Sequence, residues 1–170
     1  MKPWMALAPW LLALALAAVE MGVDPAVPGD SASARPASER VYEFDRAEAR
    51  RLRLSAGSAL VELRRGSDGW AVVEGADVAP GLIEALLEQL EVTAEAPRVA
   101  ASGVAADLGL DPPRAVIEVR LTDGAPLTLL MGGASPTDTS VYARVGADGP
   151  IVVAGRSLAY YTDLALGASR

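Results

Sequence analysis

The sequence contains no histidine, no cysteine and no asparagine, and it has a single glutamine, Gln89, and a single lysine, Lys2. Without an imidazole there is no Ser/His or Cys/His nucleophile pair, and without a thiol there is no disulfide, zinc–thiolate site or lipid-modified cysteine. Lys2 precedes an apolar run, which removes lysine chemistry from the folded part. We therefore expect a protein that is not an enzyme, and we assign no catalytic, metal-ligating or cofactor-binding residue.

The chain has 170 residues, a hydrophobic fraction of 51% and a net charge of −7. This length and apolar content are sufficient for one globular domain with its own core. An acidic chain lacks the basic field that attracts phosphates, so nucleic acid is not an expected partner.

An uncharged stretch runs from Pro3 to Val19, between Lys2 and Glu20. At about 1.5 Å per residue it forms roughly 26 Å of helix, the lower limit for crossing a bilayer core. Two interpretations remain open: residues 1–20 are a retained transmembrane anchor, or they are a cleaved secretory signal with small residues near its end. The lysine before the segment and the acidic residues after it predict that the folded part lies outside the cytoplasm.

Residues 21–40 contain Pro, Gly, Ser and Ala without apolar periodicity. This composition predicts a flexible linker with an r.m.s. span on the order of 25 Å. The expected organisation is an anchor or signal over 1–20, a linker over 21–40 and an extracytoplasmic domain over 41–170. The expected location is the inner (cytoplasmic) membrane, crossed once by residues 3–19, with the domain on the periplasmic or extracellular side. If the segment is cleaved, the protein is secreted or periplasmic.

Three Asp-Gly pairs, at 68–69, 123–124 and 148–149, lie between runs that alternate apolar and polar residues. This pattern is typical of β-hairpins. The expected fold class is α+β, mainly an antiparallel sheet of hairpins. The apolar residues expected on the inner side of the strands are Leu52, Leu54, Val61, Leu63, Trp70, Val72, Ala115, Ile117, Val119, Leu121, Leu127, Leu129, Met131, Val141, Ala143, Val145, Ile151 and Val153.

Two helices are predicted within the domain. The first spans about 78–92, with Asp77 as N-cap and Pro80 in its first turn. Its buried stripe consists of Leu82, Ile83, Leu86, Leu87 and Leu90, and the opposite side carries Glu84, Glu88, Glu91 and Glu95. No cation lies four residues from these glutamates, so we expect a solvated acidic face. The second helix spans about 156–166, with Ser157 as cap and an inner side formed by Leu158, Tyr161, Leu164 and Ala165.

The stretch DLGLDPPRAVIEV, residues 107–119, combines a glycine, two prolines and an alternating apolar run. We expect Gly109 to end a helical turn, Leu110 to point back at the core, and the chain from Asp111 to stay extended until the strand begins. The stretch is therefore interpreted as a stiff corner. The alternative is a cation site formed by Asp107 and Asp111, although two carboxylates fall short of a calcium loop.

The segment DLGLDPPRAVIEVRLTDGAPLTLLMGG resembles the Gly-Leu-x-x-Pro segment, strand, turn and Gly-ended strand of the bacterial domain-of-unknown-function family 4340. The segments GWAVVEG, ADVAPGLIEALLEQL and VYARVGADGPIVVAG occur in the order typical of that family. The resemblance covers roughly Val41 to Leu166, in a single copy. It implies an extracytoplasmic α+β domain without established catalysis, associated in some relatives with ABC transport systems, and it transfers no functional residue.

Three further groups of residues have two interpretations each. A concentrated positive patch comprises Arg46, Arg50, Arg51, Arg53, Arg64 and Arg65. It either grips a carboxylate or phosphate or, as we favour, forms a solvated sheet face paired with Glu48 and Glu62. The segment MGGASPTDTS, residues 131–140, is either an anion cradle or a hairpin loop, and Tyr160 and Tyr161 form either a ring-stacking platform or helix packing.

The leading functional hypothesis is a membrane-tethered, non-catalytic module that binds another envelope or membrane protein, such as an ABC-type export component. One alternative is a carboxylate-dependent hydrolase of cell-wall sugars, which needs two carboxylates roughly 5 to 9.5 Å apart across a cleft. The aromatic content of 5% disfavours it. The other alternative is a carrier of a small ligand or lipid, which needs an apolar cavity of a few hundred Å³.

Overall fold

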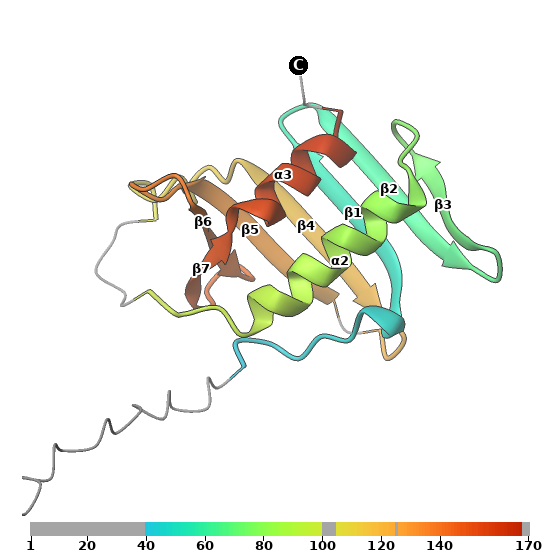
Figure 1. Ribbon diagram of the computed structural model, residues 1–170, viewed down its shortest axis with the longest axis horizontal. Coiled ribbons are helices and arrows are strands. Elements are labelled where there is room, and N and C mark those ends of the chain that lie inside the picture. The colour runs from blue at the N-terminus through green and yellow to red at the C-terminus, as the bar shows by residue number, and fades with distance from the viewer. Residues whose placement is uncertain (1–39, 100–104, 125, 168–170) are drawn as a thin grey trace, which may run out of the picture. The chain divides into compact units, whose positions relative to one another are not determined.

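The computed structural model describes residues 40–99, 105–124 and 126–167. Seven strands form one antiparallel sheet in the order β3-β2-β1-β4-β5-β6-β7 (Figure 1). The elements are η2 (Arg46–Glu48), β1 (Ala49–Ala56), β2 (Ala59–Gly66), β3 (Gly69–Glu74), α2 (Pro80–Ala94), β4 (Ala115–Leu121), β5 (Pro126–Ala134), β6 (Ser140–Val145), β7 (Ile151–Gly155) and α3 (Arg156–Ala165). The predicted α+β class, with a hairpin sheet, one central helix and a C-terminal helix, is confirmed.

The predicted apolar helix within residues 1–20 and residues 21–39 of the predicted linker lie outside the described residues. Among the helices that are described, none combines the length and the apolar character needed to cross a membrane. The anchor, the linker and the location therefore stay predictions.

The sheet consists of two meanders joined side by side. The first contains β3, β2 and β1, the second contains β4 to β7, and the two meet where β1 pairs with β4. All three Asp-Gly pairs occupy hairpin turns, as predicted. Gly69 and Gly124 have φ angles of 106° and 81°, a region that side chains oppose. An ideal Cβ on Gly149 would lie 1.9 Å from the Val145 carbonyl oxygen, so that turn has no room for a side chain.

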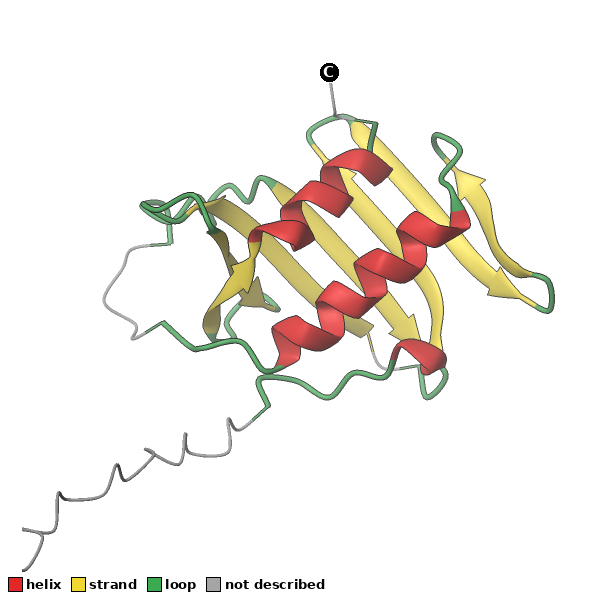
Figure 2. Cartoon of the chain, viewed as in Figure 1, coloured by secondary structure: helices red, strands yellow, loops and turns green. Residues whose placement is uncertain are grey.

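Both α2 and α3 lie on the same face of the sheet (Figure 2). The core fills the space between them and the inner side of the strands. Its largest fully buried side chains are Leu52, Leu54, Val61, Leu63, Ile83, Leu86, Leu87, Leu90, Ile117, Leu129, Met131 and Leu158. Each such side chain contributes about 1.5–3 kcal/mol through the removal of apolar area from water. The chain thus places its alternating and helical apolar residues in a single core.

Strand β7 has the opposite phase to the one predicted. Val152 and Ala154 are buried, whereas Ile151 and Val153 are half-buried on the other face. The register explains the difference, because Val152 lies opposite Ala143, whose side chain is in the core. The sequence Ile-Val-Val-Ala is apolar on both sides, so its alternation does not select a face.

The helix caps also differ from the prediction. Ala79 is the N-cap of α2 and Gly155 is the N-cap of α3, and neither makes a side-chain cap hydrogen bond. Helix α2 begins instead at Pro80, whose fixed φ suits the first helical position. The inner side of α3 consists of Leu158, Ala159, Thr162 and Ala165, while Tyr161 and Leu164 are half-buried. Small residues on this side let α3 approach its neighbours closely.

The corner before β4 packs against β5. Gly109 has a φ of 66°, and the Leu108 carbonyl oxygen accepts a hydrogen bond of 2.8 Å from the Gly133 amide. Leu110 is only 2% exposed, yet it lies outside the core cluster and contacts the Cα side of Gly132. Leu110 is thus buried, as predicted, but against β5 beneath the corner rather than in the main cluster.

Candidate interaction surface

The sheet has an open face, which we define as the face opposite α2 and α3. No described helix covers it (Figure 2). Residues paired across neighbouring antiparallel strands point to the same face, so the register places the open-face side chains in rows that run across the strands. Three such rows cover the middle of the sheet.

The first row contains three arginines. Arg51 of β1 lies opposite Arg64 of β2 and opposite Arg120 of β4. We call these three residues the arginine row. Strands lie about 4.8 Å apart, so the Cα atoms of the two outer arginines are roughly 10 Å apart. Like charges directly opposite one another destabilise a sheet unless counter-charges relieve them.

The second row supplies counter-charges to part of the arginine row. Glu62, Arg53 and Glu118 lie side by side on β2, β1 and β4. Glu62 is paired with Arg51, and its side chain is only 11% exposed. Arg53 Nε lies 3.8 Å from a carboxylate oxygen of Glu118. Glu74 of β3 lies opposite Glu62, so four arginines and three glutamates leave these two rows with a net charge of +1, in a chain whose net charge is −7.

The two outer arginines differ from the rest of the described arginines. Within residues 40–99, 105–124 and 126–167, the side chain of neither Arg64 nor Arg120 forms an ion pair or a hydrogen bond, and both residues are exposed. Every other arginine there has at least one such partner. A depression of about 160 Å³ lies beside Arg120 and is also lined by Arg51, Arg53, Glu62, Glu118 and Pro126.

The third row is largely apolar. Leu60, Ser55, Val116 and Leu130 lie in register on β2, β1, β4 and β5. All four are half-buried by their neighbours. The row continues in register with Arg144 on β6 and Ile151 on β7. The open face therefore combines an apolar band with adjacent guanidinium groups, a composition typical of the centre of protein–protein interfaces.

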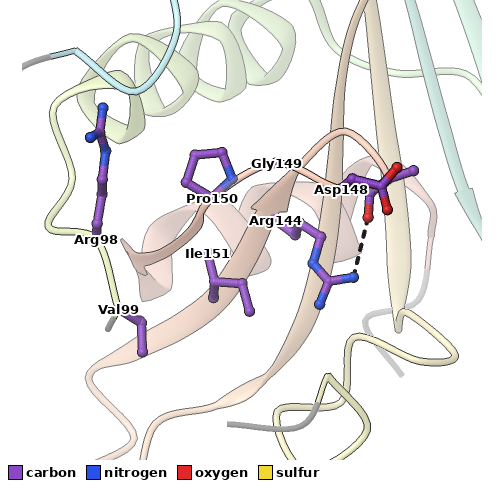
Figure 3. Close-up of a pocket in the computed structure, with 8 residues that line it drawn as sticks. Arg98, Val99, Arg144, Asp148, Gly149, Pro150 and Ile151 are labelled. Carbon is purple, nitrogen blue, oxygen red and sulfur yellow. Dashed lines mark hydrogen bonds between the residues drawn. The ribbon is translucent and has the colours of Figure 1, made fainter. Parts of the chain in front are cut away.

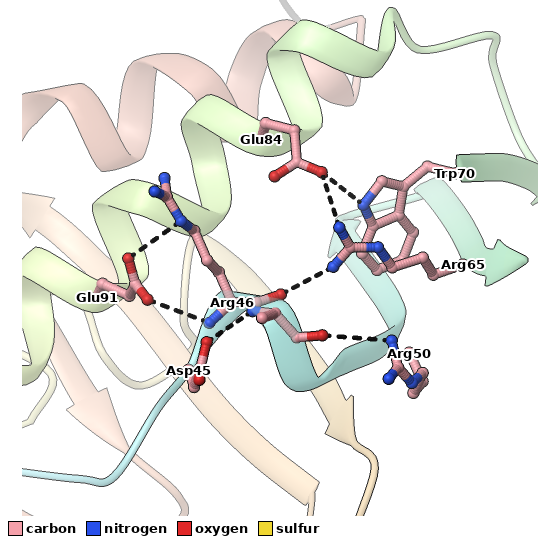
Figure 4. A network of polar contacts seen from close by, with 8 residues as sticks. Asp45, Arg46, Arg50, Arg65, Trp70, Glu84 and Glu91 are labelled. Atoms are coloured by element: carbon pink, nitrogen blue, oxygen red, sulfur yellow. Dashed lines mark hydrogen bonds and ion pairs between the residues drawn. The ribbon is translucent and has the colours of Figure 1, made fainter. Parts of the chain in front are cut away.

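The predicted six-arginine patch is divided between two faces. Arg51, Arg53 and Arg64 lie on the open face, whereas Arg46 and Arg65 contact α2 (Figure 4). The predicted pairing with Glu62 is confirmed. Glu48 pairs with no arginine among the described residues, and its carbonyl oxygen accepts a 3.1 Å hydrogen bond from the Thr122 hydroxyl.

Three of the four glutamates of the predicted acidic face have an arginine partner that the prediction did not include, although their side chains stay partly exposed. Arg65 Nη2 lies 3.6 Å from a Glu84 carboxylate oxygen, Arg46 Nε lies 3.5 Å from Glu91, and Arg40 Nη2 lies 3.5 Å from Glu95. These cations come from outside the helix, so helical spacing gave no sign of them. The same Glu84 oxygen accepts a 3.2 Å hydrogen bond from the Trp70 indole, as Figure 4 shows.

Trp70 is half-buried at the edge of the core rather than inside it. The Arg65 guanidinium lies 5.7 Å from the centroid of its ring, a cation–π distance. Arg65 also donates a 3.0 Å hydrogen bond to the Arg46 carbonyl oxygen. This network fixes β3 and η2 to α2, which makes these arginines part of the scaffold and leaves the open-face arginines as the binding candidates.

The hydroxyl-rich segment 135–140 is a hairpin loop between β5 and β6. Its hydroxyls bond one another: Thr137 and Thr139 lie 2.9 Å apart, and Ser140 donates to Ser135 at 2.9 Å. The glycines before it provide space for the corner, since an ideal Cβ on Gly132 would lie 2.4 Å from the Leu108 carbonyl oxygen. These contacts favour the hairpin-loop interpretation over the anion cradle, because the hydroxyls bond one another and the glycines make room for the corner.

Tyr160 and Tyr161 contact each other edge to face, with ring centroids 5.5 Å apart. Tyr160 is 57% exposed. The other notable tyrosine, Tyr42, is buried, and its hydroxyl donates a 2.6 Å hydrogen bond to the Leu90 carbonyl oxygen. Burial raises the pKa of Tyr42. Its role is to fix the segment before β1 to α2.

The structure gives little support to a two-carboxylate site. Asp107 and Asp111 are both exposed and line none of the depressions described here. A depression of about 330 Å³ does contain Asp45, Glu48 and Asp123. However, Asp45 accepts a 2.7 Å hydrogen bond from the Ala47 amide as the cap of η2. Among the described residues, no group of three candidate ligands could hold a metal ion.

The depressions do not provide an apolar chamber either. The one between α3 and β6 measures about 160 Å³ and is lined by the ion pairs Arg114–Asp163 and Arg156–Asp138. A larger one of about 440 Å³ lies at the β6–β7 hairpin (Figure 3). There Arg144 donates to the Ala147 carbonyl oxygen at 3.3 Å. Both are surface depressions with arginine in their lining rather than enclosed apolar chambers, which does not favour a lipid carrier.

Comparisons of the chain with protein-family models, curated proteins and solved structures find no match. The resemblance to family 4340 therefore stays a prediction. Sequence reasoning found Arg51, Arg53 and Arg64 but missed Arg120. The missing signal is the pairing of β1 with β4, which no local pattern encodes.

Proposed function

We propose that the domain is a non-catalytic contact module that binds another envelope or membrane protein through its open face. In this proposal residues 3–19 hold it at the membrane, and the partner is a membrane-associated component such as part of an ABC-type transport system. One observation carries the proposal: a seven-stranded sheet has both described helices on one face, while the other face presents an apolar band beside the arginine row.

The size of the open face fits this role. Seven strands at about 4.8 Å spacing and six residues at about 3.3 Å rise give a surface of roughly 30 by 20 Å. This corresponds to about 600 Å², close to the area that one partner contributes to a standard protein–protein interface. Half-buried apolar side chains such as Val116 and Leu130 would lose their remaining exposure on binding.

The test is site-specific photo-crosslinking with the full chain in intact cells. A photoreactive amino acid replaces Leu130 on the open face or, as control, Glu88 on the exposed side of α2. We expect a discrete adduct with one envelope protein from position 130, and loss of this adduct when Val116→Asp is added. Equal adduct patterns from both positions, or none from position 130, would contradict the proposal.

A further inference from the structure

We infer that the arginine row receives an acidic segment of the partner protein, with two carboxylates about 10 Å apart on one side of a helix. This inference rests on the proposed function and specifies the chemistry of the partner. It starts from Arg64 and Arg120, whose side chains have no hydrogen bond or ion pair within the part of the chain that the structure describes.

The three arginines of the row differ in what they can offer to a ligand. Arg51 is already occupied by Glu62, so it cannot offer its full charge to a ligand. Arg64 and Arg120 flank it on either side, and each presents an exposed guanidinium fork. Guanidinium forks bind carboxylates through paired hydrogen bonds. Two guanidinium groups, those of Arg64 and Arg120, are therefore available to a ligand, and their strands are two strand spacings apart.

The glutamates beside the row discriminate between classes of anion. Glu62 and Glu118 both line the depression next to Arg51 and Arg120. A compact dianion such as phosphate would have to approach these carboxylates, which repel it. Two separate carboxylates carry one charge each, so each is repelled less by Glu62 and Glu118 than a dianion is, and each can bind one outer arginine. A polyanionic surface such as lipid or nucleic acid is further disfavoured by the net charge of −7.

The spacing of roughly 10 Å also indicates the conformation of the partner segment. Residues i and i+7 of an α-helix lie on one side and are about 10.5 Å apart. On a β-strand, same-side residues are about 6.7 Å or 13.4 Å apart, and neither value matches. A helix lying across β2, β1 and β4 therefore brings its acidic residues to both outer arginines at once.

The experiment measures binding of a labelled synthetic helical peptide to the full chain by fluorescence anisotropy. The peptide carries Glu at i and i+7, and a matched peptide carries Gln at both positions. We expect the Glu peptide to bind about tenfold more tightly at low salt, as two exposed ion pairs allow. The preference should be lost in Arg64→Gln/Arg120→Gln and retained in Arg50→Gln/Arg156→Gln, which removes the same charge elsewhere.

Equal binding of the two peptides, or an equal loss of the preference in both double variants, would overturn the inference. So would competition by millimolar inorganic phosphate, or row-dependent binding to vesicles of anionic phospholipid, since either would assign the row to phosphate groups. The two failures are distinguishable. An adduct from position 130 that survives Arg64→Gln/Arg120→Gln supports the proposed contact face and overturns only the acidic partner segment, whereas the absence of an adduct from position 130 contradicts the proposed function itself.

Discussion

The packing of the corner against β5 makes a sharp prediction about two neighbouring glycines. An ideal Cβ on Gly132 would lie 2.4 Å from the Leu108 carbonyl oxygen and 3.0 Å from Leu110 Cγ. The same atom on Gly133 would lie 3.5 Å from that oxygen, an ordinary van der Waals distance. Overpacking of this kind costs about 1–3 kcal/mol. We therefore expect Gly132→Ala to be strongly destabilising and Gly133→Ala to be close to neutral.

For a domain of this size, 1 kcal/mol corresponds to a Tm change of roughly 4 °C. Gly132→Ala should lower the Tm by about 4–12 °C in a thermal unfolding scan followed by circular dichroism, whereas Gly133→Ala should change it by less than about 2 °C. The two substitutions share chemistry and strand, so they control for the general effect of replacing glycine in β5. Equal Tm values for the two variants would refute the claim that the corner leaves no room for a side chain at Gly132.

Three further predictions concern the core and its ties. Leu87→Ala should lower the free energy of unfolding by about 2–5 kcal/mol in urea, against less than about 0.5 for the 61% exposed Val92→Ala. Glu84→Gln, which keeps an acceptor for Trp70 but loses the ion pair with Arg65, should cost less than about 1 kcal/mol, and high salt should remove the difference from wild type. Because burial raises the pKa of Tyr42 above about 10, the stability that its neutral phenol contributes is complete below about pH 10 and is lost as the pH rises from there. The wild-type Tm should thus fall above pH 10 more steeply than that of Tyr42→Phe, while Tyr160→Phe follows the wild type.

The elements that were predictable are those whose signals are local. Each Asp-Gly pair marks its own turn, and five leucines and isoleucines at helical spacing mark α2, so neither needs information from elsewhere in the chain. The alternation of Leu52, Leu54 and their flanking arginines likewise identifies both faces of β1. Proline 80 starts α2 without a side-chain cap, and for this reason the nearby Asp77 gave a wrong boundary signal.

The elements that were not predictable depend on long-range pairing. Val152 is buried because Ala143 opposite it is buried, and the Glu84 carboxylate is occupied because β2 brings Arg65 to it. Neither partner lies within one helical turn of the residue concerned. The arginine row has the same origin: Arg51 and Arg120 become neighbours only because β1 and β4 pair across all of β2, β3 and α2.

The charge balance of the chain makes the two arginines without a side-chain partner unexpected. Asp and Glu total 22 and Lys and Arg total 15, so carboxylates exceed cations and a cation is expected to find a partner more easily than a carboxylate. Ten of the twelve described arginines make an ion pair or a side-chain hydrogen bond, at least seven of them with a carboxylate, including those that hold α2 to β2 and η2. Arg64 and Arg120 do not, and the register places them two strands apart in one row with only Arg51 between them. Two guanidinium groups without an ion pair, on the face that lacks a helix layer, add no ion-pair stabilisation to the domain. Their placement is explained if the missing carboxylates belong to the molecule that covers the face.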